Sequence, residues 1–118
     1  MKLDKHPRYC FIKGDICDSE LVKTVFDSYS PHIIFNFAAE SHIDRSIKGG
    51  VDFVKSNVEG TANILEALIG SEIERFIQIS TDEVYGSIKE GSFSENSPLN
   101  PSSPYAASKA AAEHIAMA

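Results

Sequence analysis

The stretch Ile79-Ser80-Thr81-Asp82-Glu83-Val84-Tyr85-Gly86 decides how the rest of the chain is interpreted. It follows the apolar run at residues 75–79, which is typical of a short buried strand. In parallel α/β sheets ligands bind beyond the carboxyl ends of the strands, so Thr81, Asp82 and Glu83 are expected at a ligand-binding edge. In extended backbone Asp82 and Glu83 would point in different directions, as an acid and a base acting on one substrate require. The pair alone is not decisive, because adjacent acidic residues are common in solvated loops.

A second element lies downstream, where Tyr105 and Lys109 stand four residues apart at the start of an Ala-rich helix. This spacing places both side chains on one face of the helix. The pKa of a free tyrosine is about 10, so a tyrosine acting as a base at neutral pH needs a nearby positive charge, which Lys109 supplies. The Tyr-x-x-x-Lys spacing is frequent on ordinary surface helices. Its position after the strand-end Ser-Thr-Asp-Glu stretch makes it specific.

Length and composition indicate one ordinary globular domain. The chain has 118 residues, of which 42% are hydrophobic and 24% charged, and its net charge is -6. The negative charge and the absence of a basic stripe argue against a nucleic-acid partner. No apolar run approaches the roughly 20 residues that span a bilayer, and residues 1–8 lack the apolar segment of a secretory signal. We therefore expect a cytoplasmic protein without a membrane partner.

The residues that commonly bind metals are scattered along the chain. The two cysteines, Cys10 and Cys17, lack the spacing of a zinc site and are expected to be reduced and structural. We expect no metal site from the histidines, which are His6, His32, His42 and His114.

Hydrophobic periodicity predicts alternating strands and helices, the pattern of an α/β protein with a parallel sheet. The first helix begins at Asp18 or Ser19, and the last is capped by Ser102 or Ser103. Gly60 interrupts the middle helix and predicts a close backbone contact there. Residues 87–103 form either an active-site cover or a plain connector. The predicted strands are residues 9–13, 33–38 and 75–79, and the predicted helices are residues 18–30, 51–69 and 104–118.

Together these features resemble the extended short-chain dehydrogenase/reductases, and within them the nucleotide-sugar 4,6-dehydratases that act on dTDP-glucose. The segments that carry the resemblance occur in the family's order and cover nearly the whole chain. They are residues 14–18 (Gly-Asp-Ile-Cys-Asp), 37–46 (Phe-Ala-Ala-Glu-Ser-His-Ile-Asp-Arg-Ser), 57–61 (Asn-Val-Glu-Gly-Thr), 80–86 and 105–109.

The resemblance implies a partial Rossmann-like, doubly wound parallel sheet of about three strands, with NAD as the cofactor. Asp15 and Ile16 match a pair that lies against the adenine of NAD, and Ser41 matches a residue that also reaches the sugar. The residues that the resemblance assigns to NAD are Asp15, Ile16, Phe37, Ala38, Ala39, Ser41, Ser56, Tyr105 and Lys109.

The implied reaction converts dTDP-glucose to its 4-keto-6-deoxy product while NAD is reduced and reoxidised in one turnover. In the resemblance Tyr105, assisted by Lys109, removes the proton of the C4 hydroxyl, and Thr81 hydrogen-bonds near that oxygen. Glu83 matches the base that removes the C5 proton, and Asp82 the acid that protonates the departing C6 hydroxyl. Ser41 and Thr81 are thus the expected substrate contacts.

The family pattern also contains parts that this sequence lacks. The Gly-rich strand-turn-helix that binds the NAD pyrophosphate and the C-terminal substrate region are both absent. We therefore expect residues 1–118 to be the central part of an NAD-binding domain, inactive in isolation, with the strand at residues 9–13 deprived of its neighbours. The resemblance implies a homodimer for the full-length protein, with the helix at residues 51–69 at one of its surfaces.

Two other interpretations stay open. A UDP-glucose dehydratase or an epimerase of the same superfamily shares the Tyr-Lys pair, although an epimerase needs only oxidation and hydride return and typically lacks the Asp-Glu pair. The Glu40-Ser41 pair favours the dTDP-glucose branch. A non-catalytic interaction module that associates through residues 51–69 would instead form a stable oligomer without cofactor.

Overall fold

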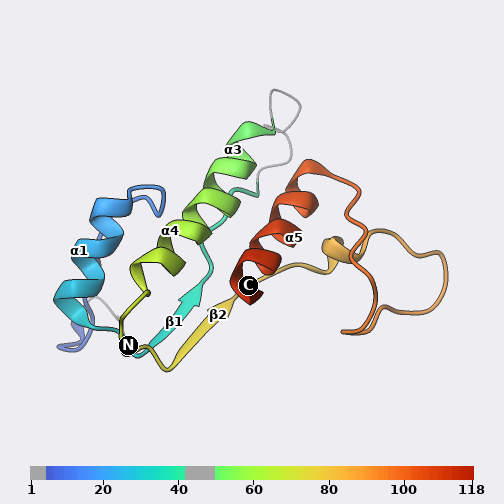
Figure 1. Cartoon of the computed structure of the whole chain (residues 1–118). Coiled ribbons are helices and arrows are strands. Elements are labelled where there is room, and N and C mark those ends of the chain that lie inside the picture. Colours follow the sequence, from blue (N-terminus) through green and yellow to red (C-terminus); the bar gives the residue numbers. More distant parts are fainter. Residues whose placement is uncertain (1–4, 42–49) are drawn as a thin grey trace.

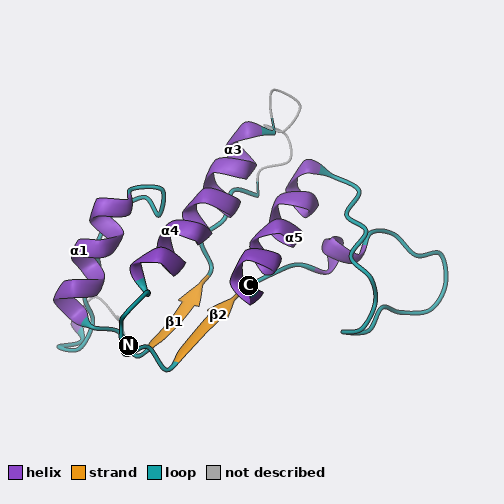
Figure 2. Cartoon of the chain, in the orientation of Figure 1, coloured by secondary structure: helices purple, strands orange, loops and turns teal. Residues whose placement is uncertain are grey.

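The structure is a computed structural model that describes residues 5–41 and 50–118, in which helices and strands alternate (Figures 1 and 2). The alternation confirms the α/β class predicted from periodicity. The elements are α1 (Ser19–Tyr29), β1 (Ile33–Asn36), α3 (Val51–Phe53), the π-helix η2 (Val54–Glu59), α4 (Gly60–Ala67), β2 (Arg75–Gln78), the 3-10 helix η3 (Asp82–Tyr85) and α5 (Pro104–Met117).

The two strands form a parallel pair, with Ile33 opposite Arg75 and Asn36 opposite Gln78. Parallel neighbours need a crossover connection, and the helical run from α3 through α4 supplies it. Figure 1 shows α3, α4 and α5 on one side of the strands. Asn36 is buried on that side, whereas Phe35, its neighbour on the opposite face of β1, is 60% exposed. The helices therefore cover one face of the sheet in the described part of the chain.

The prediction of a strand at residues 9–13 is wrong. The sheet formed by the described residues has two strands, β1 and β2, and residues 9–13 run beside α1 without joining a ladder. A strand needs a neighbour that offers free N–H and C=O groups, and no described strand stands between this segment and β1. Phe11 is consequently 73% exposed. The loss of pairing expected for this segment is confirmed.

Short-range signals placed the helix ends correctly. The Asp18 carboxylate accepts a hydrogen bond from the Leu21 N–H at 3.0 Å, which makes Asp18 the N-cap of α1. The helix ends at Ser30, whose φ is 43°. The Ser103 hydroxyl accepts from the Ala106 N–H at 3.1 Å, and Pro104 occupies the first turn of α5.

The predicted helix at residues 51–69 is helical from Val51 to Ala67, but its middle is wider than an α-helix. Val54–Glu59 forms a π-helix, an irregularity that occurs frequently at functional sites. Gly60 follows it, and a Cβ atom there would lie 2.5 Å from Ile16 Cδ1. The predicted close contact at Gly60 is confirmed, and it holds residues 16–17 against the start of α4.

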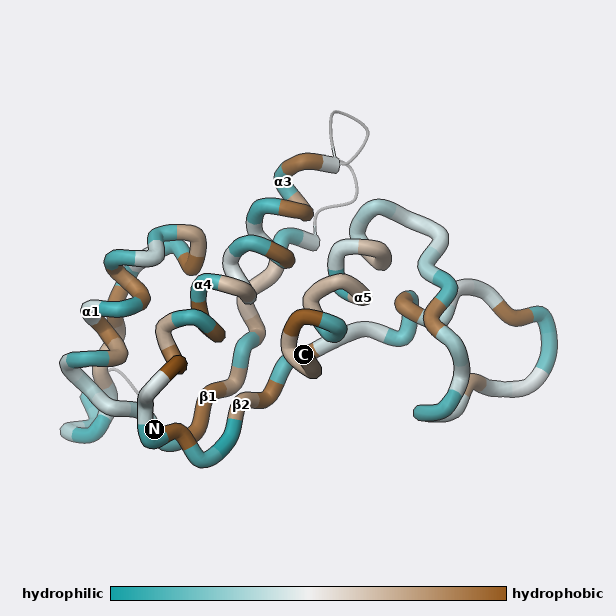
Figure 3. The backbone as a smooth tube through the Cα atoms, viewed as in Figure 1, coloured by the Kyte–Doolittle hydropathy of each residue, from teal (hydrophilic) through white to brown (hydrophobic). Residues whose placement is uncertain are grey.

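The core lies where α5 packs on η2, α4 and η3. Figure 3 shows hydrophobic stretches along β1 and β2 as well as on the helices. No helix among residues 5–41 and 50–118 is both long and apolar enough to cross a membrane. The buried apolar residues are Val22, Phe53, Ile64, Val84, Ala106, Ala110 and Ala112.

Gly86 ends η3 in a conformation that only glycine adopts readily, with φ 86° and ψ -145°. A Cβ atom there would also collide with the Asn100 carbonyl oxygen. Gly86→Ala is therefore expected to lower the free energy of unfolding by about 1–3 kcal/mol from backbone strain alone. Gly91→Ala is the matched control, because its φ is 87° but it faces open space. Urea denaturation that gave both variants the same loss would contradict the contact with Asn100.

Candidate functional site

The two sequence motifs meet at Lys109. This side chain is 4% exposed, and its Nζ donates a hydrogen bond to the Ile79 carbonyl oxygen at 2.5 Å. Ile79 directly follows β2 and precedes the Ser80-Thr81-Asp82-Glu83 run. The contact therefore anchors α5 to the carboxyl end of β2, the edge at which ligands bind in parallel sheets.

The surroundings of Lys109 act on its charge in opposite directions. Burial lowers the pKa of the Lys109 ammonium, and the carboxylate of Glu113, one helical turn further along α5, partly offsets this by favouring the charged form. A partly desolvated ammonium interacts more strongly with a nearby anion than an ammonium in water does. The Lys109 ammonium is therefore well placed to stabilise a nearby group in its anionic form.

Tyr105 is half-buried at the first turn of α5. Its ring packs edge-on against the buried Phe53, with ring centroids 6.0 Å apart. The four-residue separation places Tyr105 on the same face of α5 as Lys109. The α3 helix thus fixes the tyrosine ring, and β2 fixes the lysine.

Asp82 and Glu83 lie in a 3-10 helix, so the extended backbone expected for them is wrong. Thr81 caps this helix, with its hydroxyl oxygen accepting from the Glu83 N–H at 3.3 Å. The Thr81 hydroxyl also lies 3.4 Å from an Asp82 carboxylate oxygen, to which it donates. A 3-10 helix has three residues per turn, so successive side chains point about 120° apart. The two exposed carboxylates therefore still differ in direction.

Ser80 carries a buried hydroxyl oxygen that finds no hydrogen-bond partner among the described residues. Buried polar groups are nearly always paired with protein or with ordered water. In sequence Ser80 stands between Ile79, whose carbonyl accepts from Lys109, and Thr81. A polar group from a ligand or a water would satisfy it.

A pocket of about 290 Å³ lies where β1 ends. It brings together five of the residues assigned to NAD from the sequence. Two come from residues 14–16, two from residues 38–40, and Ser56 comes from η2. The other four do not line it: Phe37 lines a more apolar pocket of about 370 Å³ between α1 and β1, Ser41 is exposed, and Tyr105 and Lys109 lie on α5. The residues lining the smaller pocket are Gly14, Asp15, Ile16, Ala38, Ala39, Glu40 and Ser56.

Asp15 gives this pocket a fixed negative charge. Its carboxylate accepts from the Cys17 N–H at 2.9 Å, and this backbone hydrogen bond is the main reason that the pKa of Asp15 lies below its ordinary value. The Cys17 side chain adds to the effect, burial opposes it, and the Lys55 charge adds a little. Burial and the neighbouring Asp15 raise the pKa of the Cys17 thiol. The pocket thus offers an ionised carboxylate beside small side chains.

The sequence profile of the GDP-mannose 4,6 dehydratase family matches residues 1–118. The chain belongs to this family. Among the described residues, the helix that bears Tyr105 and Lys109 contacts the edge that bears Thr81, Asp82 and Glu83 through the hydrogen bond from Lys109 to Ile79.

Curated relatives cover nearly the whole chain. The chain is 52% identical to the low-salt glycan biosynthesis protein Agl12 of Haloferax volcanii over 92% of its length and 34% of Agl12. It is 50% identical to a dTDP-glucose 4,6-dehydratase of Streptomyces niveus over 93% of its length and 32% of that enzyme. The chain spans about a third of these curated relatives.

A solved structure shows the same fold in this family. The dTDP-glucose 4,6-dehydratase DesIV of Streptomyces venezuelae, solved with NAD bound, matches 96% of the chain and 34% of its own length. The identity is 47% and the TM-score 0.89. The Rossmann-like placement of β1 and β2 inferred from the resemblance is confirmed by this structural match.

Two buried polar residues near the site were missed by the sequence reasoning. Asn57, 1% exposed, accepts from the Glu40 N–H at 2.8 Å and donates to the Glu40 carbonyl at 3.1 Å. It also donates to the Ser108 hydroxyl oxygen at 2.8 Å, and Ser108 donates to the Tyr105 carbonyl at 2.7 Å. An asparagine beside the apolar stripe of the helix at residues 51–69 was the available signal.

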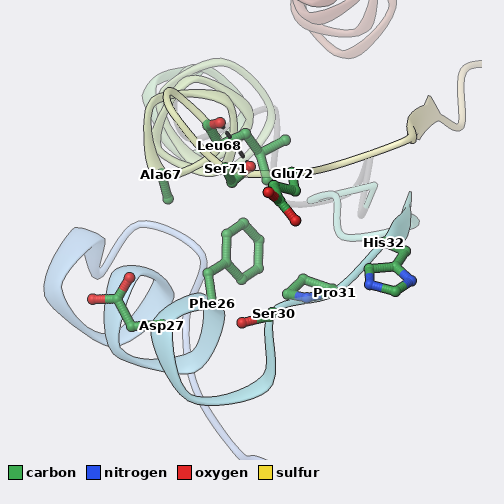
Figure 4. Close-up of a pocket in the computed structure, with 9 residues that line it drawn as sticks. All are labelled: Phe26, Asp27, Ser30, Pro31, His32, Ala67, Leu68, Ser71 and Glu72. Carbon is green, nitrogen blue, oxygen red and sulfur yellow. Dashed lines mark hydrogen bonds between the residues drawn. The ribbon is translucent and has the colours of Figure 1, made fainter.

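A third cavity lies away from these residues. It measures about 350 Å³ and is lined by residues at the end of α1, the start of β1 and the end of α4. Figure 4 shows the Phe26 ring pointing toward Leu68 across it. None of the residues predicted for catalysis or for NAD lines this cavity.

No group of three His, Cys, Asp or Glu side chains that could hold a metal ion gathers within residues 5–41 and 50–118. Part of the resemblance lies outside those ranges. His42 and the rest of the family motif at residues 42–46 belong to the segment that is not described.

Proposed function

We propose that residues 1–118 are the central part of the NAD-binding Rossmann-like domain of a dTDP-glucose 4,6-dehydratase, a lyase that forms dTDP-4-keto-6-deoxyglucose. One observation carries the proposal: the hydrogen bond from Lys109 to Ile79 joins the Tyr-Lys helix to the edge that bears Thr81, Asp82 and Glu83. Membership of the family and the dTDP-glucose 4,6-dehydratases among the relatives support the substrate.

The described residues fit NAD as the cofactor. The small residues Ala38 and Ala39 leave space beside the backbone for a flat ring, and Asp15 offers a carboxylate that accepts hydrogen bonds. NAD, when bound, supplies the hydride acceptor and the hydride donor. The residues proposed to hold it are Asp15, Ile16, Phe37, Ala38, Ala39, Ser41, Ser56, Tyr105 and Lys109.

Tyr105 is proposed to take the proton from the C4 hydroxyl of the sugar. The Lys109 ammonium favours the phenolate by its positive charge. The Thr81 hydroxyl, held at the N-cap of η3, hydrogen-bonds near the same sugar oxygen and contributes with Ser41 to substrate binding. These residues prepare C4 for oxidation.

The two carboxylates are proposed to share the elimination of water. Glu83 removes the C5 proton, which the ketone at C4 has made acidic, and Asp82 gives a proton to the departing C6 hydroxyl. Side chains that diverge from one 3-10 turn can reach neighbouring atoms of one substrate.

Glu83→Gln is expected to stop elimination while C4 oxidation continues. Loss of a general base lowers turnover by about 10²–10⁴-fold. Reduced NAD should then persist after dTDP-glucose is added, and stopped-flow absorbance would show it. The control is Glu90→Gln, which makes the same charge change at an exposed loop position. Glu83→Gln enzyme that still releases the dehydrated product at the normal rate would exclude this role.

We further propose a cytoplasmic homodimer. The cytoplasm keeps thiols reduced, which suits the free cysteines Cys10 and Cys17. Val51 and Val54 are 75% and 55% exposed on the helical run proposed for the dimer surface. Sedimentation of the native polypeptide as a dimer would support this assembly.

The function is tested with the native polypeptide that carries this sequence, incubated with NAD and dTDP-glucose. We expect a product lighter than the substrate by one water. UDP-glucose and GDP-mannose assayed in parallel decide the nucleotide, and a product of unchanged mass would indicate an epimerase. The 118 residues alone are predicted to show no turnover and little NAD binding. A stable oligomer of the native polypeptide without cofactor or turnover would favour an interaction module.

A further inference from the structure

We propose that one chain of buried and partly buried hydrogen bonds, Gln78–Asn36–Thr61–Asn57–Ser108, positions the pocket wall at residues 38–40 against the Tyr105–Lys109 helix. These five are positioning residues, because their polar groups bond to one another and to the backbone. The catalytic consequence rests on the proposed function, whereas the mechanical coupling does not.

The chain of hydrogen bonds starts where β1 and β2 end. Asn36 and Gln78 are opposite one another in the parallel register, and the Asn36 Nδ2 donates to the Gln78 Oε1 at 2.9 Å. The Asn36 Oδ1 accepts from the Ala38 N–H at 3.2 Å. One buried amide therefore joins β1 to β2 and also sets the turn that leads into the pocket wall.

Thr61 links the sheet to the helical run formed by η2 and α4. It is 0% exposed, and its Oγ1 accepts from the Asn36 Nδ2 at 3.3 Å while donating to the Asn57 carbonyl at 2.7 Å. The hydroxyl uses both its donor and an acceptor site. A valine of nearly the same shape would provide neither.

Asn57 is the branch point. Its amide binds both the N–H and the C=O of Glu40, at the pocket wall, and donates to Ser108 on α5. The Ser108 hydroxyl in turn donates to the Tyr105 carbonyl, one helical turn earlier. The π-helix from Val54 to Glu59 holds Asn57 between these two elements. The pocket wall and the tyrosine are thus tied to the same side chain.

Such a network fixes geometry more strictly than apolar packing does. A buried polar group that loses its partner is costly, so each member has one favoured arrangement, and fully satisfied networks are rigid. Through this network the pocket wall at residues 38–40 and the first turn of α5, which carries Tyr105, share one set of hydrogen-bond partners. Small errors of placement at such a site lower the rate strongly.

Thr61→Val, made in the native polypeptide, removes the middle member of this chain of hydrogen bonds. Thr24→Val is the matched control, because Thr24 also donates to the carbonyl four residues earlier, at 2.8 Å, but on exposed α1. We expect Thr61→Val to lower kcat about tenfold and to raise the KM for NAD several-fold. Thr24→Val should change neither by more than about twofold. Thr61→Ser, which keeps the hydroxyl, should restore both.

Amide hydrogen exchange separates this proposal from the proposed function. Thr61→Val should speed exchange at residues 36–41 and at residues 105–109 together, whether or not the protein turns over dTDP-glucose. Faster exchange confined to the turn around residue 61, or equal in Thr24→Val, would overturn the coupling. If Thr61→Val does not fold, Ser108→Ala is measured in its place and should affect the same two segments. Coupled exchange without dehydration would contradict the proposed function alone.

Discussion

Tyr105→Phe is expected to lower kcat for dTDP-glucose dehydration by about 10²–10⁴-fold, the range found when an acid-base group is removed. The substitution deletes one hydroxyl and leaves the ring in its edge-on contact with Phe53, at a centroid distance of 6.0 Å. The thermal midpoint should therefore change little. Steady-state turnover and thermal unfolding of the same preparation measure the two effects.

Tyr29→Phe is the matched control for this experiment. Tyr29 closes α1, is 56% exposed and hydrogen-bonds the Cys10 thiol at 3.1 Å, away from the pocket and α5. It should keep normal turnover. A Tyr105→Phe enzyme that is as active as Tyr29→Phe would remove Tyr105 from the mechanism.

Lys109→Met is expected to lower turnover by at least about 10²-fold. Its effect on the free energy of unfolding should be small, because relief from burying the ammonium offsets the lost hydrogen bond to Ile79. The methionine has a similar volume and avoids the burial of an ammonium. Burial lowers the folded pKa of Lys109 below its unfolded value, so the unfolded state binds more protons between the two. The free energy of unfolding should therefore rise as the pH climbs through this window. That rise should be smaller in Lys109→Met.

Lys89→Met serves as the control, since Lys89 is exposed in the loop after η3. Denaturant titrations across the alkaline range, paired with turnover at neutral pH, give both readouts. Lys109→Met protein that kept full activity, or that lost stability like a core cavity variant, would contradict the assigned role.

Features set by neighbouring residues could be predicted from the sequence. The caps Asp18 and Ser103 depend on a polar side chain next to a helical run. The contact at Gly60 was predictable because glycine in mid-helix is otherwise unfavourable. The family motifs supplied the candidate residues, and the hydrogen bond from Lys109 to Ile79 brings the motif at residues 105–109 to the start of the motif at residues 80–86.

Features set by distant parts of the chain could not be predicted from local patterns. Residues 9–13 have a strand-like composition, and only the comparison with the family pattern indicated that this segment would lack a partner. The 3-10 turn at Asp82–Tyr85 follows from the Thr81 cap, and Asn100 ties its end to the following loop by donating to the Val84 carbonyl at 2.9 Å. The partners of Asn57 lie 17 and 51 residues away in the sequence.

Isotope labelling follows the single hydrogen atom on which the proposed mechanism depends. The native polypeptide would be given dTDP-glucose carrying deuterium at C4, and the product would be analysed by mass spectrometry and NMR. We expect deuterium at C6 of a 4-keto-6-deoxy product, because hydride removed from C4 returns within the same turnover. Deuterium found at C4 of an undehydrated sugar, or a substrate left unchanged, would contradict the claim that this chain belongs to a 4,6-dehydratase active site.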